Sequence, residues 1–261
     1  MLKGLYTAYT GMINEQHRMD TMTNNLANAT TNGFKKEGAT SQSFDSVLAY
    51  KIKDTSEAAN LPKRLGGISL GVKVGENYVD YSGGPFKETG NKLDLALSGN
   101  GFFTISFTNK AGETSVKYTR DGNFTMTSQG YLVTQDGDFV LNEDGQRIQL
   151  DPTLEVTVER NGAIYQNGAY VDTIGLTDFE DYNYLERYGE NYFQPVEGAR
   201  VVDAPADTTI HAGYLEMSNI SVVTEMVNMI AIQRQYEANQ NVITTYDSTL
   251  ENAVNQTGRV G

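Results

Sequence analysis

Residues 222–256 read VVTEMVNMIAIQRQYEANQNVITTYDSTLENAVNQ, a stretch with neither glycine nor proline. Within it apolar or aromatic residues recur every seven positions, at Val222, Met229, Tyr236, Ile243 and Leu250. A seven-residue spacing keeps one stripe of a helix facing a partner helix. The companion line four positions further along, at Met226, Gln233, Gln240, Asp247 and Val254, is polar in its middle. We expect one long helix here, with Ser221 as its N-cap and Gly258 just past its end.

The opposite end of the chain shows the same spacing. Residues 2–27 contain no proline, and an Asn-rich run leads to a break at Asn32-Gly33. The seven-spaced line of this segment consists of Leu5, Met12, Met19 and Leu26. Its companion line, Leu2, Tyr9, Gln16 and Thr23, again turns polar. Two interpretations fit: amphipathic faces of a single core, or helices that pair with each other and with further neighbours. The length of the repeat and its place at both chain ends favour the second.

The middle of the chain, roughly 67–213, predicts strands and hairpins. Turn dipeptides typical of hairpins occur at Asn100-Gly101, Asp121-Gly122, Asp136-Gly137, Asp144-Gly145, Asn161-Gly162 and Asn167-Gly168. Strand-like runs occupy 102–105, 131–134 and 154–158. The predicted fold class is therefore α+β, with the terminal helices pairing as a coiled-coil-like layer and an all-β domain inserted between them. The expected segments are an N-terminal helix at 1–36, a connection with extended strands at 37–92, the β domain at 93–212 and a C-terminal helix at 213–261.

Composition argues against several classes of protein. There are 20 Lys and Arg against 33 Asp and Glu, a net charge of −13, which disfavours nucleic-acid binding. No apolar run approaches the ~20 residues of a membrane span, so we expect no membrane insertion. The first helix carries only Lys3 and Arg18 against Glu15 and Asp20, which argues against a membrane-surface helix. The chain has no cysteine, which excludes disulfides and thiolate metal sites, and its first residues lack the apolar core of a cleaved signal peptide.

The sequence predicts no catalytic residue, no cofactor and no metal site, so we expect no enzyme. The two histidines, His17 and His211, lie far apart, and no motif surrounds a candidate nucleophile. Asp136-x-Asp138 ahead of Asp144-Gly145 faintly resembles a calcium loop, but it lacks the glycine and the glutamate that such a loop needs. A hairpin is the better interpretation of this stretch.

Three sets of motifs resemble one known family, the rod and hook proteins of the bacterial flagellar basal body. The N-terminal motif is NNLANATTNGFK at 24–35. The central motifs are LDLALSGNGFF at 93–103 and YTRDGNF at 118–124. The C-terminal motif is GYLEMSNI at 213–220, followed by EMVNMI at 225–230 and QRQYE at 233–237. Ala212 and Asn32 depart from the residues that are usual in the family. The motifs occur in family order along nearly the whole chain.

The resemblance implies a structural subunit of the periplasmic rod that transmits torque from motor to hook. It implies a helical homopolymer built through the terminal helices, with other rod and hook subunits, the surrounding bushing rings and the flagellar export apparatus as partners. Export would follow the type III route without a cleaved signal. Length and motif order look most like the distal-rod subunit, and the proximal rod stays possible.

Three further features carry expectations. Phe44 and Leu48 resemble the export-gate motif of early flagellar substrates; the alternative is an amphipathic turn formed with Val47. The segment Ser46 to Leu65 is longer than most connections, and is either the wedge of distal-rod proteins or a surface loop. An aromatic cluster at Phe179, Tyr182, Tyr184, Tyr188, Tyr192 and Phe193 either packs inside the β domain or forms a sugar-binding face. The sugar-binding face would make the protein a peptidoglycan-binding or remodelling module.

Overall fold

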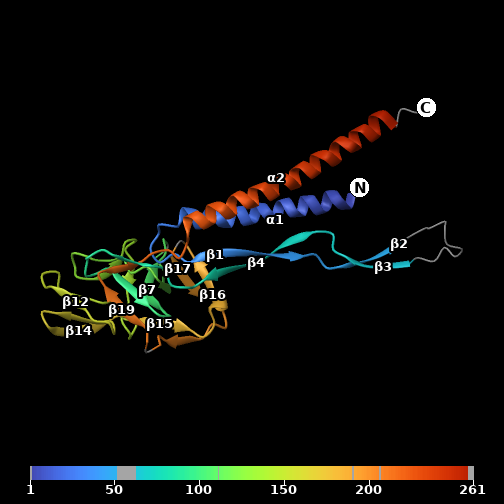
Figure 1. Ribbon diagram of the computed structural model, residues 1–261. Helices are drawn as coiled ribbons and strands as arrows, with labels where there is room; N and C mark the ends of the chain where they lie inside the picture. The colour runs from blue at the N-terminus through green and yellow to red at the C-terminus, as the bar shows by residue number, and fades with distance from the viewer. Residues whose placement is uncertain (1, 52–62, 111, 190, 206, 258–261) are drawn as a thin grey trace. The chain divides into compact units, whose positions relative to one another are not determined.

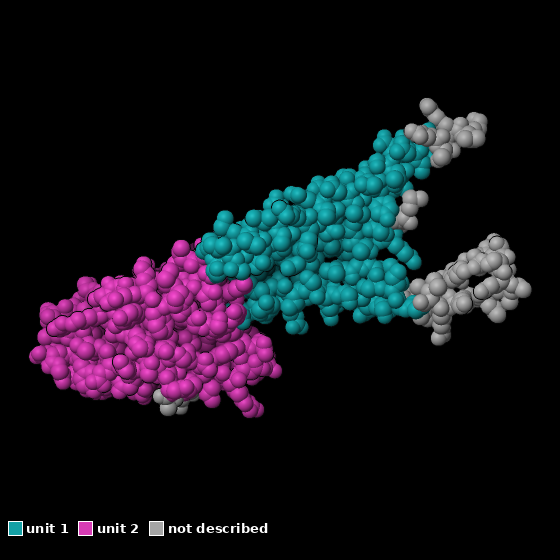
Figure 2. All heavy atoms as spheres, in the orientation of Figure 1, with its two compact units in different colours: residues 1–26, 37–79, 221–261 teal, residues 27–36, 80–220 magenta. Residues whose placement is uncertain are grey.

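The computed structural model describes residues 2–51, 63–110, 112–189, 191–205 and 207–257, and these form two compact units (Figure 2). The first unit, here the helical unit, takes residues 1–26, 37–79 and 221–261, and the second, the β unit, takes 27–36 and 80–220. Both units draw on separate stretches of the chain, which passes back and forth between them. The fold is α+β, as expected, whereas the four contiguous segments drawn from the sequence stay a prediction.

Both chain ends are helical, as the uninterrupted runs predicted. Helix α1 spans Leu2–Ala27 and helix α2 spans Val222–Asn252, after which the last described turn, η2 (Ala253–Thr257), is π-helical. Ser221 occupies the N-cap position of α2, but its side chain makes no capping hydrogen bond and accepts one from Thr224 Oγ1 at 3.0 Å instead. The N-cap position expected for Ser221 is therefore confirmed, without a capping hydrogen bond from its side chain. Over the described residues, neither helix is long and apolar enough to cross a membrane.

A two-stranded ribbon supports α1 in the helical unit. Strand β1 (Lys36–Ser43) pairs with β4 (Val72–Asp80), and α1 is attached to this ribbon by polar contacts. The Asn14 amide donates to Ser41 Oγ at 2.9 Å, and the Asn25 side chain forms two hydrogen bonds with the backbone of Glu37, at 2.7 and 2.9 Å. One side of α1 is thus occupied by the ribbon.

The segment Ser46 to Leu65 contains the paired ends of a hairpin. Strand β2 (Val47–Lys51) runs antiparallel to β3 (Lys63–Ile68), with Val47 opposite Ile68. The stretch between them, 52–62, lies outside the described residues. Because Val47 and Leu48 belong to a strand, the amphipathic turn expected from Phe44 to Leu48 is wrong.

The β unit is built around a nine-stranded sheet with the path β16-β17-β8-β7-β11-β10-β9, to which β15 and β18 add beside β7. Smaller sheets pair β12-β13-β14, β19-β6 and β20-β5. The bounds are β5 (Phe86–Glu88), β6 (Leu95–Ser98), β7 (Phe102–Thr108), β8 (Thr114–Thr119), β9 (Phe124–Met126), β10 (Leu132–Thr134), β11 (Phe139–Val140), β12 (Val156–Val158), β13 (Ala163–Gln166), β14 (Ala169–Thr173), β15 (Leu176–Phe179), β16 (Leu185–Tyr188), β17 (Tyr192–Pro195), β18 (Val201–Asp203), β19 (Thr209–Ala212) and β20 (Tyr214–Glu216), with the short helix η1 at Tyr182–Tyr184.

Strand β7 is buried on both faces because successive side chains point to opposite sides. Phe103 belongs to a mainly aliphatic core, where its ring meets the Phe124 ring edge-on at 5.1 Å, and Ile105 is buried as well. Phe102 points to the other side and packs against Phe179 and Phe193 at 6.0 and 5.3 Å. From Phe103 onward apolar and polar residues alternate along the strand, and Phe102 adds one buried ring on the opposite face.

Four of the six predicted turns connect paired strands, and two do not. Asp136-Gly137, Asn161-Gly162 and Asn167-Gly168 close hairpins, and Asp144-Gly145 lies in a turn bridged by Leu141 and Arg147. The hairpin interpretation of 136–145 is thus confirmed. Asn100-Gly101 and Asp121-Gly122 join strands that pair elsewhere. Gly122 is needed for close approach, because a Cβ there would overlap the Leu95 carbonyl oxygen.

Candidate functional site

Helices α1 and α2 lie antiparallel and side by side within the helical unit (Figure 1). Two glycines on α1 mark where they touch. A Cβ placed on Gly4 would lie 2.5 Å from the Tyr246 hydroxyl oxygen, and one on Gly11 would lie 3.0 Å from Asn239 Nδ2. Seven residues forward on α1 therefore correspond to seven residues backward on α2. Glycine suits this seam because a helix without side chains at the contact lets its neighbour approach closely.

The predicted packing residues lie at or beside this seam. Leu5, Met12, Met19 and Leu26 on α1 are half-buried, as are Met229, Tyr236 and Ile243 on α2. Val222 and Leu250, at the two ends of the α2 line, are exposed. The structure therefore places the middle of each predicted line against neighbours and leaves the ends of the α2 line uncovered.

The companion lines, which are polar in their middle, lie outside the contact between α1 and α2 on both helices. Met226, Gln233 and Gln240 are exposed, and so are Tyr9, Gln16 and Thr23. The line that faces α1 instead runs through Glu225, Ile232, Asn239 and Tyr246, three positions from the seven-spaced line rather than four. Ile232 is its best covered apolar member, only 2% exposed. Spacing alone could not separate these lines, because i+3 and i+4 neighbours flank a helical position on opposite sides.

Each helix keeps an apolar face away from the seam. On α1 the face consists of Tyr6, Tyr9 and Ile13. On the first turns of α2 it consists of Val222, Val223, Met226, Val227 and Ile230. Large apolar groups gathered at helical spacing on a surface indicate a site of interaction.

A buried charge cluster lies in the β unit, where segments from both ends of the chain meet. Lys35 Nζ lies 2.6 Å from Glu216 Oε1 and donates to the Ser82 carbonyl oxygen at 2.8 Å. Arg120 Nη1 lies 3.4 Å from the other carboxylate oxygen, and its Nη2 donates to the Gly99 carbonyl at 2.7 Å. All three charged side chains are almost completely buried. Burial lowers the pKa of Lys35, and the Glu216 carboxylate opposes that shift.

The backbone around the cluster is fixed by close contacts. Gly33 has a φ of 65° and donates its N–H to the Glu216 carbonyl at 2.7 Å; a Cβ at this position would lie 2.5 Å from the Asp121 nitrogen. Gly84 donates its N–H to Glu216 Oε1 at 2.9 Å. The Asn219 side chain accepts from the Lys36 N–H and donates to the Asp80 carbonyl oxygen, at 2.8 and 2.9 Å. The cluster therefore joins residues 33–36, 80–84 and 213–219 into one packed junction.

Sequence reasoning did not identify Lys35, Arg120 and Glu216 as a set. Each lies inside one of the three motif stretches, so the motifs marked the right segments without showing that they meet. The pairing of residues 181 positions apart has no local signal.

The aromatic cluster lies mainly inside the β unit. Phe179, Tyr192 and Phe193 are buried, whereas Tyr184 and Tyr188 are exposed. The Tyr192 hydroxyl donates to Asp138 Oδ2 at 2.9 Å. Rings that fill the interior are not available as a sugar-binding face, so the packing interpretation describes this cluster better.

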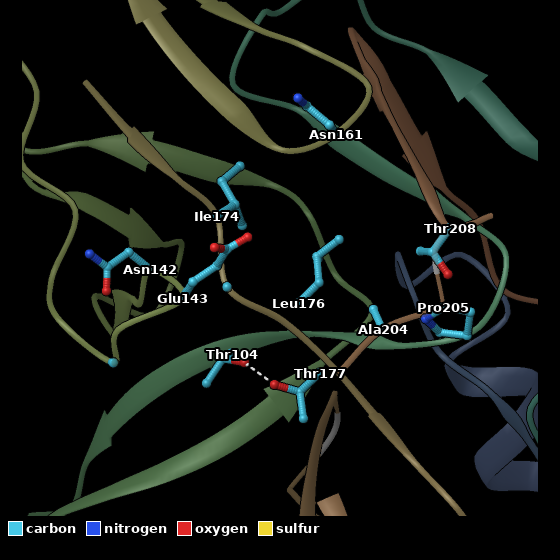
Figure 3. Close-up of a pocket in the computed structure, with 12 residues that line it drawn as sticks. Thr104, Asn142, Glu143, Asn161, Ile174, Leu176, Thr177, Ala204, Pro205 and Thr208 are labelled. Carbon is cyan, nitrogen blue, oxygen red and sulfur yellow. Dashed lines mark hydrogen bonds between the residues drawn. The ribbon is translucent and has the colours of Figure 1, made fainter. Parts of the chain in front are cut away.

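A cleft of about 540 Å³ opens on the β unit (Figure 3). Thr104 and Thr177 share a hydrogen bond of 2.8 Å on its wall, and Glu143 is the only carboxylate among its described lining residues. Hydroxyl, amide and aliphatic groups make up the rest, with no histidine among them.

Phe44, from the export-gate expectation, is exposed in the connection between β1 and β2. Its N–H donates to the Gly71 carbonyl at 3.0 Å, and its own carbonyl accepts from Ser69 Oγ at 3.0 Å. Leu48 lies in β2, and its side chain falls outside the described part of the chain.

Comparison with known proteins identifies the same three regions. Residues 5–35 match the family described as flagella basal body rod protein, residues 96–166 the D1 domain of the flagellar hook protein FlgE/F/G, and residues 211–256 the C-terminal region of flagellar basal body rod FlgEFG proteins.

Curated relatives match over the full length. The chain is 33% identical to the flagellar basal-body rod protein FlgF of Caulobacter vibrioides, over 100% of both proteins. It is also 33% identical to the rod protein FlgG of Bacillus subtilis, over 98% of this chain and 99% of that protein. The hook-basal body complex protein FlhO of Bacillus subtilis is 29% identical over 100% of both. With three matching family regions and full-length relatives of this kind, the chain belongs to the family of flagellar basal-body rod proteins and is a structural subunit of that rod.

Proposed function

We propose that this rod subunit polymerises helically through the α1–α2 pair and transmits torque from motor to hook. The observation that carries the proposal is the pair of exposed apolar faces, Tyr6–Tyr9–Ile13 on α1 and Val223–Val227–Ile230 on α2. Both faces are exposed in the described part of the subunit. A polymer of identical subunits needs surfaces of this kind, because each copy must bury apolar area against its neighbours.

The antiparallel seam gives the pair a defined shape to present to those neighbours. A coiled-coil-like layer is supported by the seven-residue match of Gly4 with Tyr246 and Gly11 with Asn239, and by the half-buried line Met229, Tyr236 and Ile243. Torque passes more effectively through packed helices than through loops, because close packing resists deformation.

The wider assignment follows from the family. We infer that other rod and hook subunits, the bushing rings and the export apparatus are partners, and that Phe44 and Leu48 belong to an export signal. The β2–β3 hairpin is the candidate wedge between neighbours. We infer that the chain has a structural and not a catalytic role, which its membership in a family of rod proteins supports. None of these relatives is described as a cell-wall-binding protein.

The test replaces Tyr9 with Asp in cells that depend on this subunit. Tyr9→Asp places a charge in the exposed α1 face, and such surface changes usually alter stability by less than about 0.5 kcal/mol. We expect a purified monomer with unchanged circular dichroism and unfolding, no subunit in isolated basal bodies and no swimming. Gln16→Asp, two turns along the same side, is the matched control and should assemble. Normal rods in Tyr9→Asp cells would contradict polymerisation through the helices.

A further inference from the structure

Helix α2 extends beyond the first described residue of α1, its neighbour in the helical unit. In the register set by Gly4 and Tyr246, Leu250 and Val254 have no counterpart among the described residues of α1. Leu250 is 38% exposed and Val254 is 71% exposed. Asp247 and Glu251 lie on the same side of α2 as Leu250, at i, i+3 and i+4 spacing, and Val254 follows in the π-helical turn η2. We call these four residues the α2 tip. It is an apolar strip flanked by two carboxylates.

The first turns of α2 present a surface of complementary character. Val223, Val227 and Ile230 are 74%, 61% and 52% exposed, and they share one side of the helix with Arg234. Arg234 is the only basic residue in α2. We call these four residues the α2 collar. Arg234, Asp247 and Glu251 form no ion pair with one another or with other residues in the described part of the chain.

We propose that the α2 tip of one subunit docks on the α2 collar of a second copy of this chain. The contact would bury Leu250 and Val254 against Val223, Val227 and Ile230 and bring the tip carboxylates to Arg234. It rests on the proposed polymerisation and names the surfaces that perform it.

Charge selects this pairing over the two symmetric ones. Two tips in contact would bring four carboxylates together, and two collars would bring Arg234 against its own copy. Like charges at an interface are unfavourable, whereas tip on collar pairs opposite signs. The surface that docks on the α2 collar is therefore the α2 tip of a second copy of the chain.

The geometry of this contact produces an open polymer. Val227 and Val254 lie 27 positions apart, which is about 40 Å along a helix at ~1.5 Å per residue. A contact between two different surfaces leaves a free tip at one end and a free collar at the other, and it extends as an open filament when the rotation between copies does not close a ring. Successive copies would thus be displaced along the helix direction.

Disulfide trapping tests the contact directly, because the natural chain has no cysteine. Full-length Val227→Cys/Val254→Cys subunits replace the natural subunit in cells, and isolated basal bodies are oxidised before non-reducing electrophoresis. We expect a ladder of covalently linked subunits, since each copy would be joined to two neighbours. Each single variant alone should stay monomeric, and rods that contain both single variants should give dimers. Ala238→Cys/Val254→Cys is the matched control on the same helix and should give no ladder.

The outcomes separate this inference from the proposed function. Dimers from Val254→Cys alone would mean that tips meet tips and would overturn the inference. Rods that contain the double variant without any ladder would also overturn it, while polymerisation through the helices would stand. Absence of the unmodified subunit from rods would contradict the proposed function itself.

A charge exchange gives a second measurement. Arg234→Glu should reduce incorporation into rods, and Arg234→Glu/Glu251→Arg should restore it, because the exchange reinstates opposite signs across the contact. Equal incorporation of Arg234→Glu and the unmodified subunit would count against the collar.

Discussion

Lys35 and Glu216 lie 181 positions apart in the sequence, and their side chains form a buried ion pair of 2.6 Å at the junction of the two chain ends. Glu216 also faces Arg120, so one carboxylate balances two buried cations. A buried pair is not by itself strong evidence of stabilisation, because removing both charges from water is costly. Removing only the Glu216 carboxylate is costly, because Lys35 and Arg120 would then stay buried without an opposite charge.

Glu216→Gln should therefore destabilise the β unit strongly. The substitution keeps the shape and leaves Lys35 and Arg120 buried without a counterion, a change that typically costs about 3–5 kcal/mol. Urea unfolding followed by circular dichroism measures the effect. Glu180→Gln removes the exposed partner of Arg200 and should change the free energy of unfolding by less than about 1 kcal/mol. Similar urea midpoints for the two variants would show that the buried cluster contributes no more to stability than the exposed ion pair does.

The Asp121 carboxyl should make the free energy of unfolding fall as the pH rises through the weakly acidic range. Burial raises the pKa of the Asp121 carboxyl from 3.8 to about 6, with Asp136 and Asp94 adding to the shift and hydrogen bonds from Asn123 and Asn191 opposing it. The folded protein thus binds the proton more tightly than the unfolded chain. The resulting stabilisation is complete below about pH 4 and is lost as pH rises through about 6, a change on the order of 2–3 kcal/mol.

Asp121→Asn removes this dependence, because the amide resembles the protonated acid. The new amide can donate to Asn191 Oδ1, a buried oxygen with no hydrogen-bond partner, once the Asn191 side chain turns over. We expect a flatter stability profile between pH 4 and 6 and a more stable protein at pH 7, measured by thermal unfolding across that range. Asp144→Asn, in an exposed turn, is the control and should keep the slope. A slope that survives in Asp121→Asn would assign it to another group.

The antiparallel helix register predicts one specific cross-link within the subunit. A Cβ at Gly11 lies 3.4 Å from Asn239 Cγ, close enough for Gly11→Cys/Asn239→Cys to form a disulfide. Oxidation of dilute monomer should give a compact band that migrates faster on non-reducing gels. Gly11→Cys/Tyr246→Cys places the second thiol seven positions out of register and should stay reduced. Oxidation of the second pair at the same rate would contradict the seam.

The sequence predicted the elements better than their contacts. The two terminal helices follow from long runs without proline, the second of which also lacks glycine, and their bounds agree within a few residues. Burial along α1 does not follow the seven-residue spacing alone, because α1 has two neighbours, α2 on one side and the β1–β4 ribbon on another, so polar Asn14 is buried while Tyr9 is exposed. Burial in such a helix depends on tertiary partners that periodicity does not reveal.

The role of each Asn-Gly or Asp-Gly dipeptide could not be read from the sequence alone either, because it also depends on tertiary neighbours. Asn167-Gly168 has positive φ at both positions and closes a hairpin, as local chemistry predicts. Gly122 follows an aspartate in the same way, yet it is needed because another strand's carbonyl lies against it. A dipeptide reports the turn it favours and carries no information about a neighbour brought in from elsewhere.

The last prediction concerns the β2–β3 hairpin. Among the described residues β2 and β3 pair only with each other, and Val47 lies opposite Ile68. Removing residues 48–63 should therefore leave α1, the β1–β4 ribbon and the β unit folded, with unchanged thermal unfolding of the monomer. If the hairpin is the wedge that family resemblance implies, export and polymerisation continue while the rod loses its stiffness, because neighbours are no longer held apart by the inserted strands. Electron microscopy of basal bodies from the deletion strain should then show curved or flexible rods. Replacing only 52–62 with Gly and Ser keeps the paired strands and tests whether they suffice. Straight rods of normal stiffness in the 48–63 deletion would mean that the hairpin is a surface feature, and the assignment to the distal rod would lose its local support.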